Sequence, residues 1–198
     1  SAPEDPLAIG DWTRVYPEVT AADLYDVWAL DSDDIWAVGD DGTVLHHDGQ
    51  HVTSHSVGRN LSLRGVDGTA RDDVWVHSGL HVWHWDGRDW QPVALPLIPD
   101  WSSRIEDLVV TGAGEVWLAM RRGLPVPEGD GHVERNLPVV LRLAAGRCDQ
   151  WILSDQVTSR MTLWSVATDG PLLVVAEQPG PREPRVHHFT GTTWEPLD

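Results

Sequence analysis

Short apolar runs alternate with polar turns along the whole chain, and the same order of runs recurs four times. In the first copy the runs cover residues 26–30, 34–38, 43–47 and 51–57. Runs that are rich in Val, Ile and Trp and bounded by Gly and Asp predict strands, because branched and aromatic side chains pack well on a pleated surface. Turns such as Asp48-Gly49 supply the positive φ that a tight hairpin needs. The pattern therefore predicts an antiparallel meander of four strands in about 40 residues.

The four copies span about residues 24–60, 61–95, 104–153 and 161–198. The second strand of the first three copies carries Trp36, Trp75 and Trp117, and we align Leu173 with them in the fourth copy. One such sheet cannot bury both of its faces, whereas radial stacking lets each sheet cover the next. The repeat predicts an all-β fold, a β-propeller of four four-stranded repeats.

We expect a flexible leader at residues 1–10 and a single propeller domain at residues 11–198, since 198 residues suffice for one substantial core. Closure of the ring stays open. Residues 11–15 could add a closing strand, yet residues 193–197 already end the fourth copy with a strand candidate. We favour a small closed ring of four blades, and the alternative is that the repeats form part of a larger ring.

Tryptophan dominates the aromatic residues, with 12 Trp beside two Tyr and one Phe. Because most of them recur at equivalent strand positions, we expect Trp28, Trp36, Trp75 and Trp117 to pack between blades. Trp101 lies outside the repeat, in a loop at residues 97–103, and is the best candidate for an exposed aromatic contact.

The stretch from Leu24 to Trp28, followed by residues 33–49, resembles the Trp-rich propeller repeats of exported myxobacterial proteins. It also shares features with kelch-type, Asp-box and tectonin-like propellers. The resemblance covers residues 12–198 and is strongest in the first two copies. It implies a β-propeller exported by a bacterium to the periplasm, the cell surface or the medium. Roles in that family are mostly unassigned, so the resemblance implies architecture and location more than activity.

The charge is strongly negative, with 14 Arg, no Lys, 31 acidic residues and a formal net charge of −17. Such a charge repels phosphate backbones and anionic lipid surfaces, so we expect no nucleic-acid binding. A cationic or neutral partner is favoured instead. We also expect no membrane span, because no apolar run approaches the roughly 18 residues that cross a bilayer.

Cysteine and histidine do not point to a metal. Cys148 is alone, which excludes an internal disulfide and a multi-thiolate site. His46, His84 and His188 occupy the same third-strand place in three copies, and a shared bond to a neighbouring turn explains this more simply than a shared metal. We expect no metal site and no cofactor.

The third copy carries a polar insertion, residues 121–138, between its second and third strands, and the fourth copy has a shorter one at residues 177–185. Both would lie on one face of the propeller, as long loops on a rigid scaffold where binding residues are often placed. A tolerated surface insertion is the alternative. The candidate binding residues are Trp101, Arg121, Arg122, His132 and Arg135.

Three functions remain open. We favour a non-enzymatic binding module whose loop-bearing face holds a protein partner, since no catalytic set is visible. The first alternative is a lectin-like propeller whose exposed Trp rings stack on a glycan. The second is a propeller hydrolase or lyase, which needs convergent carboxylates or a His base beside a nucleophile. Glu106, Asp107 and Glu115 are not obviously so arranged, and we assign no catalytic residue.

Overall fold

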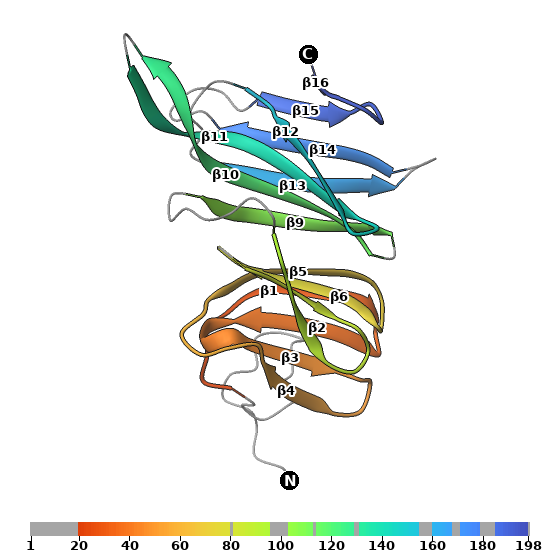
Figure 1. Cartoon of the computed structure of the whole chain (residues 1–198). Coiled ribbons are helices and arrows are strands. Elements are labelled where there is room, and N and C mark those ends of the chain that lie inside the picture. The colour runs from red at the N-terminus through yellow and green to blue at the C-terminus, as the bar shows by residue number, and fades with distance from the viewer. Residues whose placement is uncertain are drawn as a thin grey trace, which may run out of the picture.

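The computed structural model describes residues 20–79, 81–95, 103–112, 114–128, 131–154, 160–167, 171–178 and 185–197. These residues form four antiparallel sheets of four strands each, and strands that follow one another in sequence pair in space (Figure 1). This is the predicted meander, repeated four times. The predicted leader at residues 1–10, the strand candidate at residues 11–15 and Trp101 lie outside the described residues.

Each sheet is one blade. Blade 1 contains β1 (Leu24–Asp31), β2 (Asp34–Gly39), the short 3-10 turn η1 (Asp40–Gly42), β3 (Thr43–His47) and β4 (Val52–Ser56). Blade 2 contains β5 (Leu63–Ala70), β6 (Asp73–Ser78), β7 (Val82–Trp85) and β8 (Trp90–Val93). Blade 3 contains β9 (Arg104–Gly112), β10 (Glu115–Glu128), β11 (Gly131–Ala144) and β12 (Arg147–Ile152). Blade 4 contains β13 (Arg160–Ala167), β14 (Pro171–Gln178), β15 (Arg185–Phe189) and β16 (Trp194–Pro196).

The first strands of the blades pack on one another in chain order, β1 on β5, β5 on β9 and β9 on β13. Figure 1 shows the blades following one another from the N-terminal to the C-terminal end of the molecule. Stacked meanders whose first strands line one side are the blades of a β-propeller. Among the described residues β1 and β13 share no comparable contact, so the four described blades form an open arc and do not close the small ring that we favoured from the sequence.

Strand register defines equivalent positions in the blades. Cross-strand partners are Trp36 and His46 in blade 1, Trp75 and His84 in blade 2, Trp117 and Arg142 in blade 3, and Val174 and His188 in blade 4. The shared third-strand place of His46, His84 and His188 is therefore confirmed. The position of the second-strand Trp is taken in blade 4 by Val174, so the alignment with Leu173 was wrong by one residue.

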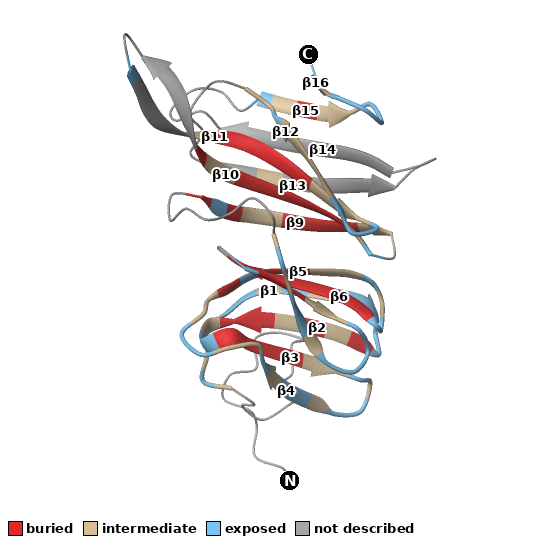
Figure 2. Cartoon of the chain, viewed as in Figure 1, coloured by how far each residue is buried: buried red, intermediate tan, exposed pale blue. Residues whose placement is uncertain are grey.

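The core lies between the blades. The face of a blade that carries Trp36, Trp75 or Trp117, here called the Trp face, packs on the opposite or back face of the next blade. Trp36 and Trp117 are almost fully buried, and Trp28 packs half-buried against the first of these cores. Figure 2 shows buried residues on the first strands β5 and β9 and on the middle strands, whereas the outermost strands β4, β8 and β12 carry none. The predicted packing of these Trp rings between blades is confirmed.

Two carboxylates protect the free edges of the first strands. Asp26 Oδ2 accepts a hydrogen bond from the Val66 N–H at 2.9 Å, and Asp67 Oδ2 accepts one from the Val110 N–H at 2.8 Å. Each carboxylate thus reaches from one blade to an unpaired amide of the next. Burial raises the pKa of Asp67, although hydrogen bonds from backbone N–H groups oppose this rise. Paired in this way, the edge is no longer a template for another strand.

The insertion of the third copy is not a loop. β10 and β11 continue as a ladder from Arg121 opposite Pro138 to Glu128 opposite Gly131, so a two-stranded hairpin projects from blade 3 (Figure 1). β9 begins at Arg104, the partner of Arg121, and within the described part of the chain no strand pairs with this edge of β10 beyond that point. Proline lacks an N–H donor and is tolerated on such an edge, so Pro125 and Pro127 do not end the strand. In the fourth copy, β14 and β15 are paired to Glu177 and Arg185, and residues 179–184 lie outside the description.

Candidate functional site

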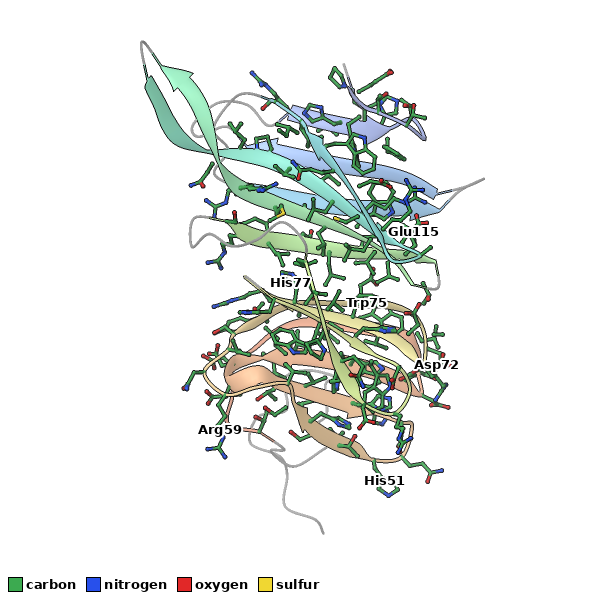
Figure 3. The ribbon with its side chains drawn as sticks, viewed as in Figure 1. His51, Arg59, Asp72, Trp75, His77 and Glu115 are labelled. Atoms are coloured by element: carbon green, nitrogen blue, oxygen red, sulfur yellow. The ribbon has the colours of Figure 1, made fainter. Side chains whose placement is uncertain are left out.

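The two ends of the blades differ in charge. At one end lie the turns that join first to second strands, with Asp72 and Glu115, and at the other lie the connections between blades, with Arg59 (Figure 3). This second end, which we call the arginine end, includes Arg59, Arg64, Arg104, Arg121 and Arg122, together with the acids Asp40, Asp41 and Glu106. On a chain of net charge −17, a local gathering of arginine marks a surface suited to negative groups.

A pocket of about 310 Å³ opens at the arginine end, between the connection of blades 1 and 2, the β6–β7 hairpin and the start of blade 3. Its lining is Asn60, Leu61, Ser62, Arg64, Ser78, Gly79, His81 and Arg104. Two of these residues are positively charged at neutral pH and none is negatively charged. The pocket is therefore a cationic recess on an acidic protein.

Arg64 is positioned by Tyr25 of the preceding blade. The guanidinium carbon lies 3.9 Å from the centre of the Tyr25 ring, a cation–π contact. The Tyr25 hydroxyl donates to Asp40 Oδ2 at 2.8 Å, and Ser62 donates to the other oxygen. The bonds from Ser62 and Tyr25 hold the pKa of the Asp40 carboxyl below its usual range. Arg64 itself donates no hydrogen bond within the described part of the chain, so its N–H groups stay available.

Arg104 joins the pocket to the insertion of blade 3. Its Nε lies 3.5 Å from Glu106 Oε1. The same oxygen accepts two shorter bonds from Arg121, 2.8 Å from Nε and 2.6 Å from Nη2. Because Arg121 is the main partner of Glu106 and the Arg104 side chain is 52% exposed, Arg104 keeps donors for a ligand. Arg122 donates to Gln150 Oε1 at 2.7 Å and is held against β12.

The structure separates the site residues predicted from sequence. Arg121 and Arg122 lie at the root of the hairpin, and Arg121 connects to the pocket through Glu106. His132 and Arg135 belong to the projecting part of β11, where they pair with Pro127 and Leu124. Their side chains, like all of Trp101, fall outside what the structure describes.

Sequence reasoning missed Arg64 and Arg104, the two arginines that line the pocket. A signal was present: Arg64 follows Leu63 and Arg104 precedes Ile105, and these two apolar residues hold equivalent places at the start of β5 and β9. Because Leu63 and Ile105 hold equivalent places on adjacent blades, Arg64 and Arg104 beside them come close together when the blades stack.

Two of the three third-strand histidines, His46 and His84, bond the acid that begins the neighbouring second strand. Asp34 Oδ1 accepts the Trp36 Nε1–H at 2.8 Å and lies 2.7 Å from His46 Nε2, while the His46 ring stacks on Trp36. Blade 2 repeats the arrangement with its own acid, indole and imidazole. In blade 3 the acid is Glu115 and Arg142 replaces the histidine. Among the described residues, no His, Cys, Asp or Glu cluster has the geometry of a metal site.

The remaining candidates for chemistry do not converge. Glu106 lies near the arginine end of β9, whereas Glu115 begins β10 at the opposite end. A second pocket, of about 420 Å³, lies between blades 2 and 3 and is lined largely by apolar groups with Cys148 among them. Burial raises the pKa of the Cys148 thiol, which keeps it in its weakly nucleophilic protonated form at neutral pH.

Comparison with known proteins gives no family. No protein-family model matches the chain, and no curated protein matches it. One similar solved structure is titled "YCF48 bound to D1 peptide", with 16% identity over 90% of this chain and 68% of that chain and a TM-score of 0.44. The class, a β-propeller, follows from the strand order and register. Among the described residues no helix is long and apolar enough to cross a bilayer.

Proposed function

We propose that this chain is a non-enzymatic binding module that holds a carboxylate of a protein partner in the pocket at its arginine end. The observation that carries the proposal is the pairing of Arg64 and Arg104 in one recess, with N–H donors that the described residues leave unused. Guanidinium groups are planar and match a carboxylate with two parallel hydrogen bonds.

The size and charge of the site limit the ligand. A recess of about 310 Å³ accepts a chain terminus or one acidic side chain, and a folded domain would have to rest on its rim. The net charge of −17 repels a strongly acidic partner at long range. A neutral or basic protein that presents a single carboxylate, above all a C-terminal one, satisfies both conditions.

The rigidity of the arginines favours binding. Arg64 is already stacked on Tyr25, so little side-chain freedom is lost when a ligand binds. Arg121 is fixed by Glu106, which also contacts the pocket residue Arg104, and so offers a prepared rim. Arg122 is bound to Gln150 on the outermost strand of blade 3. We include the projecting hairpin, with His132 and Arg135, and Trp101 as further contacts of the partner.

Short peptides test the proposal. We would measure binding of fluorescein-labelled neutral and basic peptides, each with a free and with an amidated C-terminus, by fluorescence polarisation. Peptides with a free carboxylate should bind, and amidation should weaken binding by about tenfold or more, because hydrogen bonds to a charged group contribute about 1.5–3 kcal/mol. Arg64→Ala and Arg104→Ala should cause a similar loss.

Arg88→Ala is the matched control, since its side chain is 90% exposed in the turn between β7 and β8, at the opposite end of the blade. It should leave binding unchanged. If amidated peptides bound as well as free ones, or if the two pocket variants behaved like the control, the carboxylate site would be refuted.

The lectin alternative gains no support from the described indoles, because each of them is buried or half-buried. The export implied by the resemblance to exported Trp-rich repeat propellers is part of our proposal. Fractionation of the native cells tests it: the protein should be recovered with periplasmic or extracellular markers, and recovery with a cytoplasmic marker would contradict it.

A further inference from the structure

Blade 1 has an uncovered apolar back face. On its first strand Val27 is 64% exposed and Leu24 is 45% exposed. Ile35 and Ala37, which lie on the same face of β2, are only half-buried. Scattered exposed apolar residues are common, but four that share one sheet face form a patch that calls for an explanation.

The same positions are buried in the next two blades. Leu63 and Ile105 hold the place of Leu24 in the register and are 0% and 1% exposed. Val66 and Leu108 hold the place of Val27 and are 5% and 4% exposed. All of these residues are aliphatic, so the difference in exposure comes from the neighbouring blade: the preceding blade covers blades 2 and 3, whereas no described blade packs on this face of blade 1.

Blade 1 is therefore not built as a terminal cap. End repeats of stacked arrays carry a polar outer face, because that face meets water. Leu24 and Val27 retain instead the residue type that an inter-blade core requires. The back face of blade 1 continues an interface that the molecule already uses between each pair of successive blades.

The other end of the arc carries a complementary signal in its sequence. The second strand of blade 4 contains Leu172-Leu173-Val174-Val175-Ala176, with no polar residue in either of the two alternating sets of positions. A continuous apolar strand of this length is typical of a sheet covered on both faces. Among the described residues, blade 3 is the one blade that packs on blade 4.

We propose that the back face of blade 1 is covered by blade 4 of a second copy of this chain. Two arcs joined head to tail around a twofold axis form a ring of eight blades, within the range of about four to eight that propellers adopt. Each closing contact repeats the geometry of the three inter-blade contacts inside one chain. The exposed Leu24 and Val27 side chains become part of an inter-blade core in the same step.

The mass in solution tests this inference independently of the peptide-binding proposal. Sedimentation velocity should give about 44 kDa, twice the 22.0 kDa of one chain. Because both copies are strongly acidic, added salt should screen their repulsion and strengthen the dimer. Val27→Glu places a charge in the proposed contact and should weaken the dimer by about tenfold or more.

The variant is expected to fold, because residue 27 is exposed in the isolated chain, and circular dichroism checks this. Ile152→Glu is the control: Ile152 is also 51% exposed but lies on the outermost strand of blade 3, so its variant should dimerise like the parent. A parent chain that stays at 22 kDa up to high concentration and salt overturns the inference. A dimer that Val27→Glu leaves intact also overturns it, since it must use another surface.

Discussion

Replacing Asp73 by Ala removes the centre of the acid, indole and imidazole cluster of blade 2. Asp73 Oδ1 accepts the Trp75 Nε1–H at 2.8 Å and lies 2.9 Å from His84 Nε2, and Oδ2 accepts the Thr69 hydroxyl. Asp73 and Trp75 are both buried. An alanine at this position leaves the indole N–H without a partner in a place that water does not reach.

The expected cost is about 3–5 kcal/mol. A hydrogen bond to a charged group contributes about 1.5–3 kcal/mol, and an orphaned buried donor costs about 1–3 kcal/mol. The losses are not additive, because the three donors share one carboxylate. Domains of this kind have total stabilities of about 5–15 kcal/mol, so the variant should be close to unfolding at physiological temperature. Asp73→Asn keeps one acceptor and should lose about half as much.

Urea unfolding at pH 7, followed by tryptophan fluorescence, measures the effect. Asp72→Ala is the matched control, because Asp72 is the preceding residue, is exposed and makes no side-chain hydrogen bond within the described residues (Figure 3). It should shift the free energy of unfolding by no more than about 0.5 kcal/mol. Equal losses in the two variants would refute the role assigned to the cluster.

The same cluster predicts a pH dependence. Burial alone would raise the pKa of Asp73, but the hydrogen bonds from Thr69, Trp75 and His84 outweigh it and leave the pKa lowered. A carboxyl with a lowered folded pKa stabilises the protein above its unfolded pKa of about 3.9, and this contribution is lost as the pH falls through the folded value. The difference in stability between the parent and Asp73→Asn should therefore narrow below about pH 4. A constant difference down to pH 2 would contradict the assignment.

Three further predictions concern other parts of the molecule. Gly65→Ala should destabilise by about 1–3 kcal/mol in thermal unfolding, because the new Cβ would lie 2.5 Å from His77 Nε2, whereas Gly112→Ala meets no atom within 4 Å and should not. Burial lowers the pKa of His77 to about 4, so the unfolded state, with a pKa of about 6.5, takes up the proton first and stability should fall by about 3 kcal/mol between pH 6.5 and 4. For His77→Gln the free energy of unfolding should change less between pH 6.5 and 4. If it changed as much as in the parent, the assignment of a buried neutral imidazole to His77 would be refuted. Replacing residues 124–135 by Asn-Gly should leave the melting temperature within a few degrees, because the described core residues of β10 and β11 lie at positions up to 120 and from 139 on; a large drop would show that the hairpin supports the fold.

Much of the fold could be predicted from sequence because its repeating positions carry strong local signals. An acid two residues before Trp36 or Trp75 both begins the strand and bonds the indole, so the spacing is conserved between copies for two physical reasons. In blade 4 neither residue is present, and the alignment there slipped by one position to Leu173. A shift of one residue exchanges the two faces of a strand, which is why this error matters.

The hairpin and the pocket could not be predicted in the same way. Prolines and charges in residues 121–138 favour a loop when they are considered alone, and strands tolerate them because no described strand pairs with the β9 side of β10 beyond Arg121. The pocket combines Arg64 and Arg104, which come from two repeats and meet through the stacking of blades. Their equivalent places at the start of β5 and β9 are a signal that can be used only once the order in which the blades stack is known.

The carboxylates that bond across blades each reach from an earlier blade to the one that follows it in sequence. Asp26 finds its amide only on the second blade, and Asp67 only on the third. During synthesis on the ribosome the earlier blade emerges first, with its carboxylate still hydrated and its Trp face bare. The inter-blade hydrogen bonds and packing of each blade can therefore form only after the next blade has left the exit tunnel. Until then the nascent chain must stay soluble with the Trp face exposed.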